Sequence, residues 1–125
     1  MTSSSADILL AEDDEDLREA MVDTLHDAGY SVEAVGNGRD ALEWLEDAVA
    51  LPKLILLDLM MPVMDGWQFM AARRKAPKVA AVPVVVLSAN GTFTDREETV
   101  AFIQKPVRLK SLLALIAGYC TSRPA

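Results

Sequence analysis

The sequence predicts an α/β domain built on a doubly wound parallel sheet with helices on both faces. Short apolar segments alternate along the chain with amphipathic segments of helical period, which is the pattern of repeated βαβ units. In most of the short apolar segments, almost no polar residue interrupts the run of apolar residues. This is expected for parallel strands that are buried on both faces of a sheet.

Five segments are predicted to form strands. Each is short and rich in apolar residues. They are ADILLA at 6–11, YSVEAV at 30–35, KLILLD at 53–58, VPVVVLS at 82–88 and AFIQK at 101–105. The fourth segment is the richest in β-branched residues, and a proline near its start is compatible with the opening of a strand.

The segments between the strands carry apolar residues at helical spacing. Residues 17–29 present one apolar face, and Gly29 is a suitable helix stop. Asn37 and Asp65 are predicted to cap the next two helices with their side chains. A last helix is expected at 109–120.

The interval between Ser88 and Lys105 departs from this pattern. Its central part, NGTFTDREETVA at 90–101, offers little more than a turn or two of helix, capped by Thr94 or Asp95 with Glu97 or Glu98. Every other crossover has room for a longer helix. The fourth helix is therefore expected to be short or absent.

Composition narrows the possible functions. With 125 residues the chain is expected to be a single domain, residues 1–125, with a core at about 7–120 and no second domain attached. The net charge of -7 argues against direct nucleic-acid or membrane-surface binding, and no apolar run reaches the roughly 18 residues of a membrane helix. The single cysteine, Cys120, and the absence of a recognisable secretory signal favour a cytoplasmic setting.

Polar side chains follow four of the predicted strands where each strand ends. Ligands bind at this edge of an open parallel sheet. The residues are Glu12, Asp13 and Asp14 after the first strand, Asp58 at the end of the third, Ser88 at the end of the fourth and Lys105 at the end of the fifth. Several carboxylates close together favour a bound cation, and an all-oxygen site suits Mg²⁺. Because a carboxylate can attack phosphorus, the pattern indicates phosphoryl capture on Asp58 assisted by Mg²⁺.

These residues resemble the receiver domain of two-component response regulators. The resemblance extends from Asp7 to about Cys120 and is carried by four ordered motifs: ILLAEDDEDLRE, LILLDLMMPVMDGW, VVVLSA and FIQKP. It implies a flavodoxin-like fold of the CheY type, with strand order 2-1-3-4-5. It also implies that Asp58 is the phosphoacceptor and that Glu12 and Asp13 support Mg²⁺ together with Asp58.

The resemblance implies further roles around Asp58. The backbone carbonyl of Met60 would bind the metal, and Ser88 and Lys105 would each contact a phosphoryl oxygen. Ser88 and Phe102 would act as switch residues that respond to phosphorylation. Pro106 would be structural through a cis Lys105-Pro106 bond. Independently of the resemblance, Asp65 and Gly66 are expected to be structural, forming a turn and helix start.

Ordinary structural roles are expected for several other residues. Trp44 and Trp67 are interpreted as packing residues on helix faces. His26 is expected to be solvated among acidic neighbours. The basic run at 73–75 is interpreted as an exposed helix end that complements the helix dipole. Asp14 is expected to begin the capping turn of the first helix.

The sequence therefore favours a non-enzymatic phosphoacceptor that changes its affinity for partners. Its expected partners are a histidine kinase or phosphotransfer protein and an unidentified downstream protein, and it is expected to be a monomer or weak dimer. One alternative is a pseudo-receiver that binds partners without phosphorylation. The other is a Mg²⁺-dependent phosphatase with an aspartyl nucleophile, against which Met60 counts because such enzymes place a second aspartate at that position.

Overall fold

The computed structural model describes residues 5–89 and 101–120, and within these residues five strands form one parallel sheet. The strands are β1 (Ile8–Ala11), β2 (Val32–Val35), β3 (Leu54–Asp58), β4 (Val84–Ser88) and β5 (Ala101–Gln104). Their order is β2-β1-β3-β4-β5. The doubly wound fold and its strand order are thus confirmed, and the observed strands lie inside the segments predicted for them.

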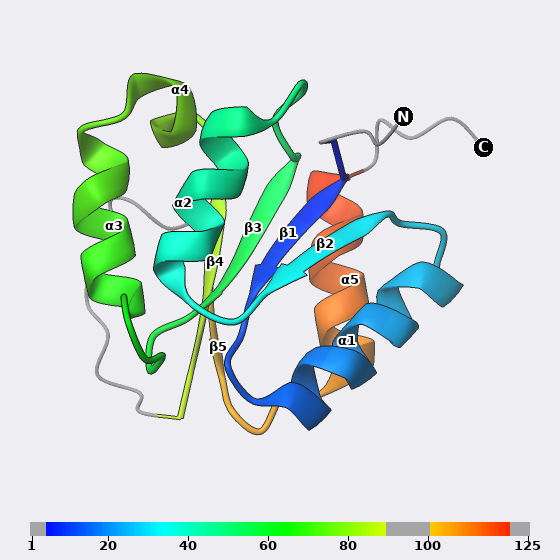
Figure 1. Ribbon diagram of the computed structural model, residues 1–125. Coiled ribbons are helices and arrows are strands. Elements are labelled where there is room, and N and C mark those ends of the chain that lie inside the picture. The colour runs from blue at the N-terminus through cyan, green and yellow to red at the C-terminus, as the bar shows by residue number, and fades with distance from the viewer. Residues whose placement is uncertain (1–4, 90–100, 121–125) are drawn as a thin grey trace.

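Helices cover both faces of the sheet (Figure 1). They are α1 (Glu15–Asp27), α2 (Gly38–Asp47), α3 (Gly66–Arg74), α4 (Pro77–Ala80) and α5 (Leu109–Tyr119). The helices α2, α3 and α4 pack on one face, and α1 and α5 pack on the other. The short helix α4 was not predicted. It is a single turn that begins at a proline, so it has no apolar periodicity to reveal it.

The core consists of two apolar layers that alternate along the strands. In β3, Ile55 and Leu57 face the layer formed with α2 and α3, whereas Leu54 and Leu56 face the layer formed with α1 and α5. All five residues of β3 are buried, including Asp58. The strand is therefore fixed by packing on both sides, and its last residue is held at the edge of the sheet.

Three polar side chains begin the helices next to the sheet edge. Asp14 caps α1 by accepting from the Leu17 N–H, at 3.1 Å. Asn37 caps α2, and Asp65 caps α3 in a reciprocal capping box with Gln68. At the other end of α1, Gly29 adopts a φ of 99°, which a residue with a side chain rarely adopts.

Two predictions about side chains were wrong. Arg73 is not part of an exposed basic run, because it is buried and its Nη2 donates to the carbonyls of Ala80 and Val82. Trp67 does not pack into the core, since 48% of its surface is exposed. Trp44 is partly buried against the core, as predicted.

The predicted shortening of the fourth crossover helix, with its caps at Thr94 or Asp95, falls on residues 90–100 and lies outside the described residues. The helix called α4 here precedes β4 and is a different element. In the described part of the chain, no helix is long and apolar enough to cross a membrane.

Candidate functional site

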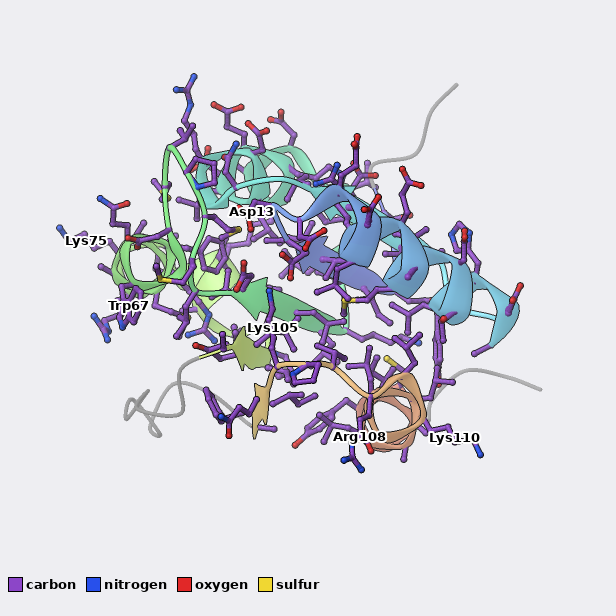
Figure 2. All side chains as sticks on the ribbon, turned by 90° about the horizontal axis from the view of Figure 1, so that it is seen from below. Asp13, Trp67, Lys75, Lys105, Arg108 and Lys110 are labelled. Carbon is purple, nitrogen blue, oxygen red and sulfur yellow. The ribbon has the colours of Figure 1, made fainter. Side chains whose placement is uncertain are left out.

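The sheet brings residues from four strands to one edge. The register pairs Asp58 with Leu87 and Ser88 with Gln104, so the ends of β3, β4 and β5 lie level with one another. Glu12 and Asp13 directly follow β1, the other neighbour of β3. In the view of this edge from below, Asp13 and Lys105 both lie near the centre (Figure 2).

Lys105 connects two of the carboxylates. Its Nζ lies 2.9 Å from Glu12 Oε1 and 3.3 Å from Asp58 Oδ1. Its backbone is fixed by an N–H donated to the Ser88 carbonyl at 2.8 Å, and the Lys105-Pro106 peptide bond is cis, as predicted. The side chain is 20% exposed, so the ammonium can be reached from the edge of the sheet.

Glu12 is fully buried and held at several points. Its backbone N–H donates to the carbonyl of Val35 at 3.0 Å, which continues the β1–β2 pairing by one residue. Its Oε2 accepts from the Asp14 N–H at 3.0 Å, while Oε1 contacts Lys105. Arg18 Nη1 donates to the Glu12 carbonyl at 2.8 Å. The carboxylate of Glu12 is therefore held in one orientation.

Asp58 carries an unusual electrostatic environment. Only 2% of its surface is exposed, and its Oδ1 accepts from the Met60 N–H at 3.4 Å. Burial, the negative charge of Glu12 and the hydrogen bond with the Asp13 side chain raise the pKa of Asp58 from 3.8 to about 7. The Lys105 charge and the Met60 N–H act in the opposite direction but do not outweigh them.

Lys105 stays positively charged in this environment. Burial lowers the pKa of its ammonium, but the hydrogen bond to Glu12 and the charges of Glu12 and Asp58 more than compensate. The net result is a pKa raised above the ordinary lysine value. Lys105 is therefore a permanent cation at neutral pH, able to neutralise an anionic group brought to this edge.

The acidic residues fit a hard divalent cation. Glu12, Asp13 and Asp58 each offer a carboxylate oxygen, and these atoms lie within 4.8 Å of one another. Two of the three residues are buried, and a single lysine does not compensate their charge, as the raised pKa of Asp58 shows. A cluster of carboxylate oxygens without nitrogen or sulfur ligands suits Mg²⁺.

The loop after Asp58 is tightly constrained. The Gly66 N–H donates to the Leu59 carbonyl at 2.9 Å, and a Cβ on Gly66 would approach the Leu59 Cα to 2.7 Å. Val63 adopts a φ of 69°, an uncommon value for a β-branched residue. The Met60 side chain is exposed, and its backbone N–H faces Asp58. Binding of metal by the Met60 carbonyl stays a prediction.

The structure places the two predicted switch residues at different depths. Ser88 is fully buried at the end of β4. Phe102, in β5, is partly buried and packs against the core layer formed with α2 and α3. Both adjoin the site through the β3–β4–β5 pairing. Movement of either residue stays a prediction.

Sequence reasoning assigned Arg18 no role in the site. Its contact with the Glu12 carbonyl joins α1 to the end of β1, six residues earlier in the chain. The available signal was its place in the first turn of a helix, because long helical side chains point back toward the N-terminus. That signal could suggest the direction of the side chain but not its acceptor.

Comparison with known proteins decides the family. A family model described as the response regulator receiver domain matches residues 8–117. The chain belongs to this family. An uncharacterized 14.6 kDa protein of Leptolyngbya boryana, from the sodA1 3' region, is 34% identical over 128 residues, which cover 98% of this chain and 96% of that protein.

Other relatives of this receiver domain are longer proteins. The transcriptional regulatory protein HprR of Escherichia coli strain K12 is 37% identical over 115 residues, covering 87% of this chain and 49% of HprR. Response regulator Rre1 of Synechocystis is 33% identical over 124 residues, covering 94% of this chain and 53% of Rre1. The chain thus spans about half the length of these two relatives.

Solved receiver structures share the fold. The receiver domain of sensor histidine kinase PA1611 from Pseudomonas aeruginosa superposes with a TM-score of 0.81 at 27% identity, covering 94% of this chain and 99% of that domain. That structure has a magnesium ion coordinated in its active site cleft. The chemotaxis response regulator CheY4 of Vibrio cholerae superposes with a TM-score of 0.78 at 28% identity, covering 90% and 96% of the two chains.

Proposed function

We propose that this receiver domain accepts a phosphoryl group on Asp58 from a phosphohistidine of a histidine kinase or phosphotransfer protein. The observation that carries the proposal is the contact of the Lys105 ammonium with both Glu12 and Asp58, beside three converging carboxylates. A buried nucleophile, a fixed cation and a place for a second cation are the parts that phosphoryl transfer needs.

In the transfer, a carboxylate oxygen of Asp58 forms a bond to phosphorus as the bond from phosphorus to the histidine nitrogen breaks. The electron pair of the broken bond stays on the histidine nitrogen. Asp58 must be ionised to attack, and its pKa of about 7 means that a bound cation would favour the reactive form. Lys105 would transfer its contact from the Asp58 carboxylate to a phosphoryl oxygen, and the Ser88 hydroxyl would donate to another.

Glu12, Asp13, Asp58 and the Met60 carbonyl would hold Mg²⁺, which supplies positive charge against the phosphoryl oxygens when bound. The magnesium ion in the PA1611 receiver domain supports this assignment, because that domain shares the fold of this chain. The three carboxylates of this chain already converge closely enough to share one ion.

Phosphorylation would change the affinity of the domain, residues 1–125, for an unidentified downstream protein. Ser88 and Phe102 are the proposed switch residues, because β4 and β5 connect them to the site. The net charge of -7 favours a protein partner over direct binding to nucleic acid. A cytoplasmic setting and a monomeric or weakly dimeric state stay predictions.

Intact-mass measurement with acetyl phosphate tests the central proposal. We expect the wild-type protein to gain one phosphoryl group in the presence of Mg²⁺ and none when Mg²⁺ is chelated. Asp58→Asn serves as the matched control and should stay unmodified. A wild type that is never labelled, or an Asp58→Asn variant labelled equally well, would refute the proposal.

A further inference from the structure

Among the residues that the structure describes, Arg18 is the side chain of α1 that reaches back to the backbone of the site. Its Nη1 donates to the Glu12 carbonyl at 2.8 Å, and the side chain is partly buried. We propose that Arg18 is a positioning residue, which holds the β1–α1 loop in the shape that presents Glu12 and Asp13 to Mg²⁺. This inference rests on the function proposed above and assigns a role in it to a residue outside the acidic cluster.

The geometry makes Arg18 suited to fixing this loop. Its backbone N–H donates to the Asp14 carbonyl at 2.8 Å, which places Arg18 in the first turn of α1. A long side chain there points toward the helix N-terminus and so toward the end of β1. The guanidinium is planar and rigid, and it holds an acceptor with less loss of freedom than a lysine would.

Arg18 completes the fixation of Glu12. The Glu12 N–H is already held by Val35 in β2, and Arg18 holds the carbonyl on the other side of the residue. With both backbone groups fixed, the Glu12 carboxylate can be oriented by the Asp14 N–H and Lys105. These contacts come from β2, from the start of α1 and from the segment after β5, so the loop is fixed from several directions.

Asp13 depends on this arrangement more than Glu12 does. It is exposed, so packing does not hold its side chain in place. Its side chain is hydrogen-bonded to Asp58, and its neighbours are fixed, Glu12 by the contacts above and Asp14 by capping α1 through the Leu17 N–H. If Arg18 released the Glu12 carbonyl, Asp13 would lose the fixed backbone that directs its carboxylate toward Asp58.

A role for Arg18 as a simple surface charge does not fit its contacts. It lines a shallow groove of about 340 Å³ beside Glu19 and Asp23, yet within the described residues it forms an ion pair with neither. Its guanidinium is directed to a neutral carbonyl instead. The contact sets the shape of the backbone rather than balancing a charge.

The charge of Arg18 and its positioning contact would affect Mg²⁺ binding in opposite directions. A cation close to three carboxylates repels Mg²⁺, so removing only the charge should strengthen binding. Removing a positioning contact should weaken Mg²⁺ binding, because free energy must then be spent on ordering the carboxylates when the ion binds. The direction of the change therefore separates the two roles.

The experiment measures the Mg²⁺ dissociation constant of the full chain by calorimetric titration. Arg18→Met should weaken Mg²⁺ binding about tenfold, the lower end of the effect of losing a residue that orients metal ligands. Arg18→Lys, which keeps one donor of similar reach, should recover part of the affinity. Arg39→Met is the matched control, because Arg39 pairs with Glu43 on the exposed surface of α2, and it should bind Mg²⁺ within twofold of wild type.

Amide NMR spectra provide a second readout, which shows whether the change is confined to the β1–α1 loop. The Asp13 and Asp14 amides should shift in Arg18→Met before any metal is added, whereas amides of α3 should not. If Arg18→Met does not fold, the comparison of Arg18→Lys with wild type tests the inference instead. Arg18→Lys should then bind Mg²⁺ about threefold more weakly, because the planar donor group is lost.

Failure of the inference about Arg18 can be told apart from failure of the proposed function. A wild-type protein that does not bind Mg²⁺ would overturn the metal site itself and this inference with it. A wild type that binds Mg²⁺, with Arg18→Met binding as tightly or more tightly, would leave the site intact and overturn only the role of Arg18. Arg18→Lys binding no better than a folded Arg18→Met would also overturn it.

Discussion

The ammonium of Lys105 lies 3.3 Å from a carboxylate oxygen of Asp58, although β4 separates β3, which ends at Asp58, from β5, which Lys105 follows. Lys105 spans this distance because it follows the end of β5, where its backbone N–H bonds to the Ser88 carbonyl. The side chain then crosses the end of β4 to reach Asp58 and Glu12. One cation thus serves two buried carboxylates that repel each other.

Replacing Lys105 should destabilise the metal-free protein. In Lys105→Met, Glu12 and Asp58 would lose their shared cation and remain buried, which should cost about 1–3 kcal/mol in the free energy of unfolding at pH 8. Urea unfolding in the presence of a chelator measures this loss. The control is Lys110→Met on the exposed side of α5, which should change stability little. Equal stability of the two variants would argue against a shared cation.

The pH dependence of stability should reveal the shifted carboxyl. The pKa of Asp58 is about 7 in the folded protein and 3.8 ordinarily, so between these values the folded state holds the proton more tightly. Stability from this group is therefore complete below about pH 4 and is lost as the pH rises to about 7. Asp58→Asn has no such loss and should be the more stable protein at pH 8, by on the order of 1–3 kcal/mol.

Urea unfolding of wild type and Asp58→Asn at pH 5, 6, 7 and 8, without metal, tests this expectation. The difference in stability should grow with pH and should shrink when Mg²⁺ is added, because the ion stabilises only the protein that binds it. A difference that is independent of pH would mean that Asp58 titrates normally in the folded state.

Arg73 should stabilise the fold without affecting the site. Its guanidinium donates to the carbonyls of Ala80 and Val82 at 2.8 and 2.7 Å, and so fixes the connection from α3 to β4. Arg73→Met should lower the free energy of unfolding by about 1–3 kcal/mol, because buried acceptors lose their donor. Lys75→Met, at the exposed end of α3, is the control for removing a charge. Mg²⁺ affinity should be the same in both variants, and a selective loss in Arg73→Met would contradict a purely structural role.

The sequence predicted those features that depend on local chemistry or on strand ends. Asp14, Asn37 and Asp65 cap helices because a cap needs only a short polar side chain and the backbone a few residues on. Asp58 and Lys105 could be assigned to one edge because all strands of a parallel sheet end on the same side.

The features that sequence reasoning missed depend on long side chains with distant acceptors. Arg73 was expected to be solvated in a basic run, but it is buried because the unpredicted turn α4 and the start of β4 offer it two carbonyls. Arg18 reaches a carbonyl of the neighbouring strand end in the same way. Periodicity cannot identify such acceptors, since they are backbone groups that every residue carries.

A Cβ at Gly66 should disturb the loop that leaves Asp58. In Gly66→Ala the new atom would lie 2.7 Å from the Leu59 Cα and 2.8 Å from the Asp58 carbonyl oxygen, so the backbone must move. Such crowding typically costs about 1–3 kcal/mol of stability. Because the displaced loop carries Met60, Mg²⁺ binding should weaken too. Thermal unfolding and calorimetric Mg²⁺ titration measure the two effects.

Gly118 supplies the matched control for this substitution. It lies in the last turn of α5, and a Cβ there would meet nothing within 4 Å. Gly118→Ala should therefore raise stability by roughly 0.5–1 kcal/mol, because alanine restricts the unfolded chain and favours the helix. Its Mg²⁺ affinity should equal that of wild type. If Gly66→Ala behaved like Gly118→Ala in both measurements, the contact between Gly66 and the end of β3 would not constrain the site.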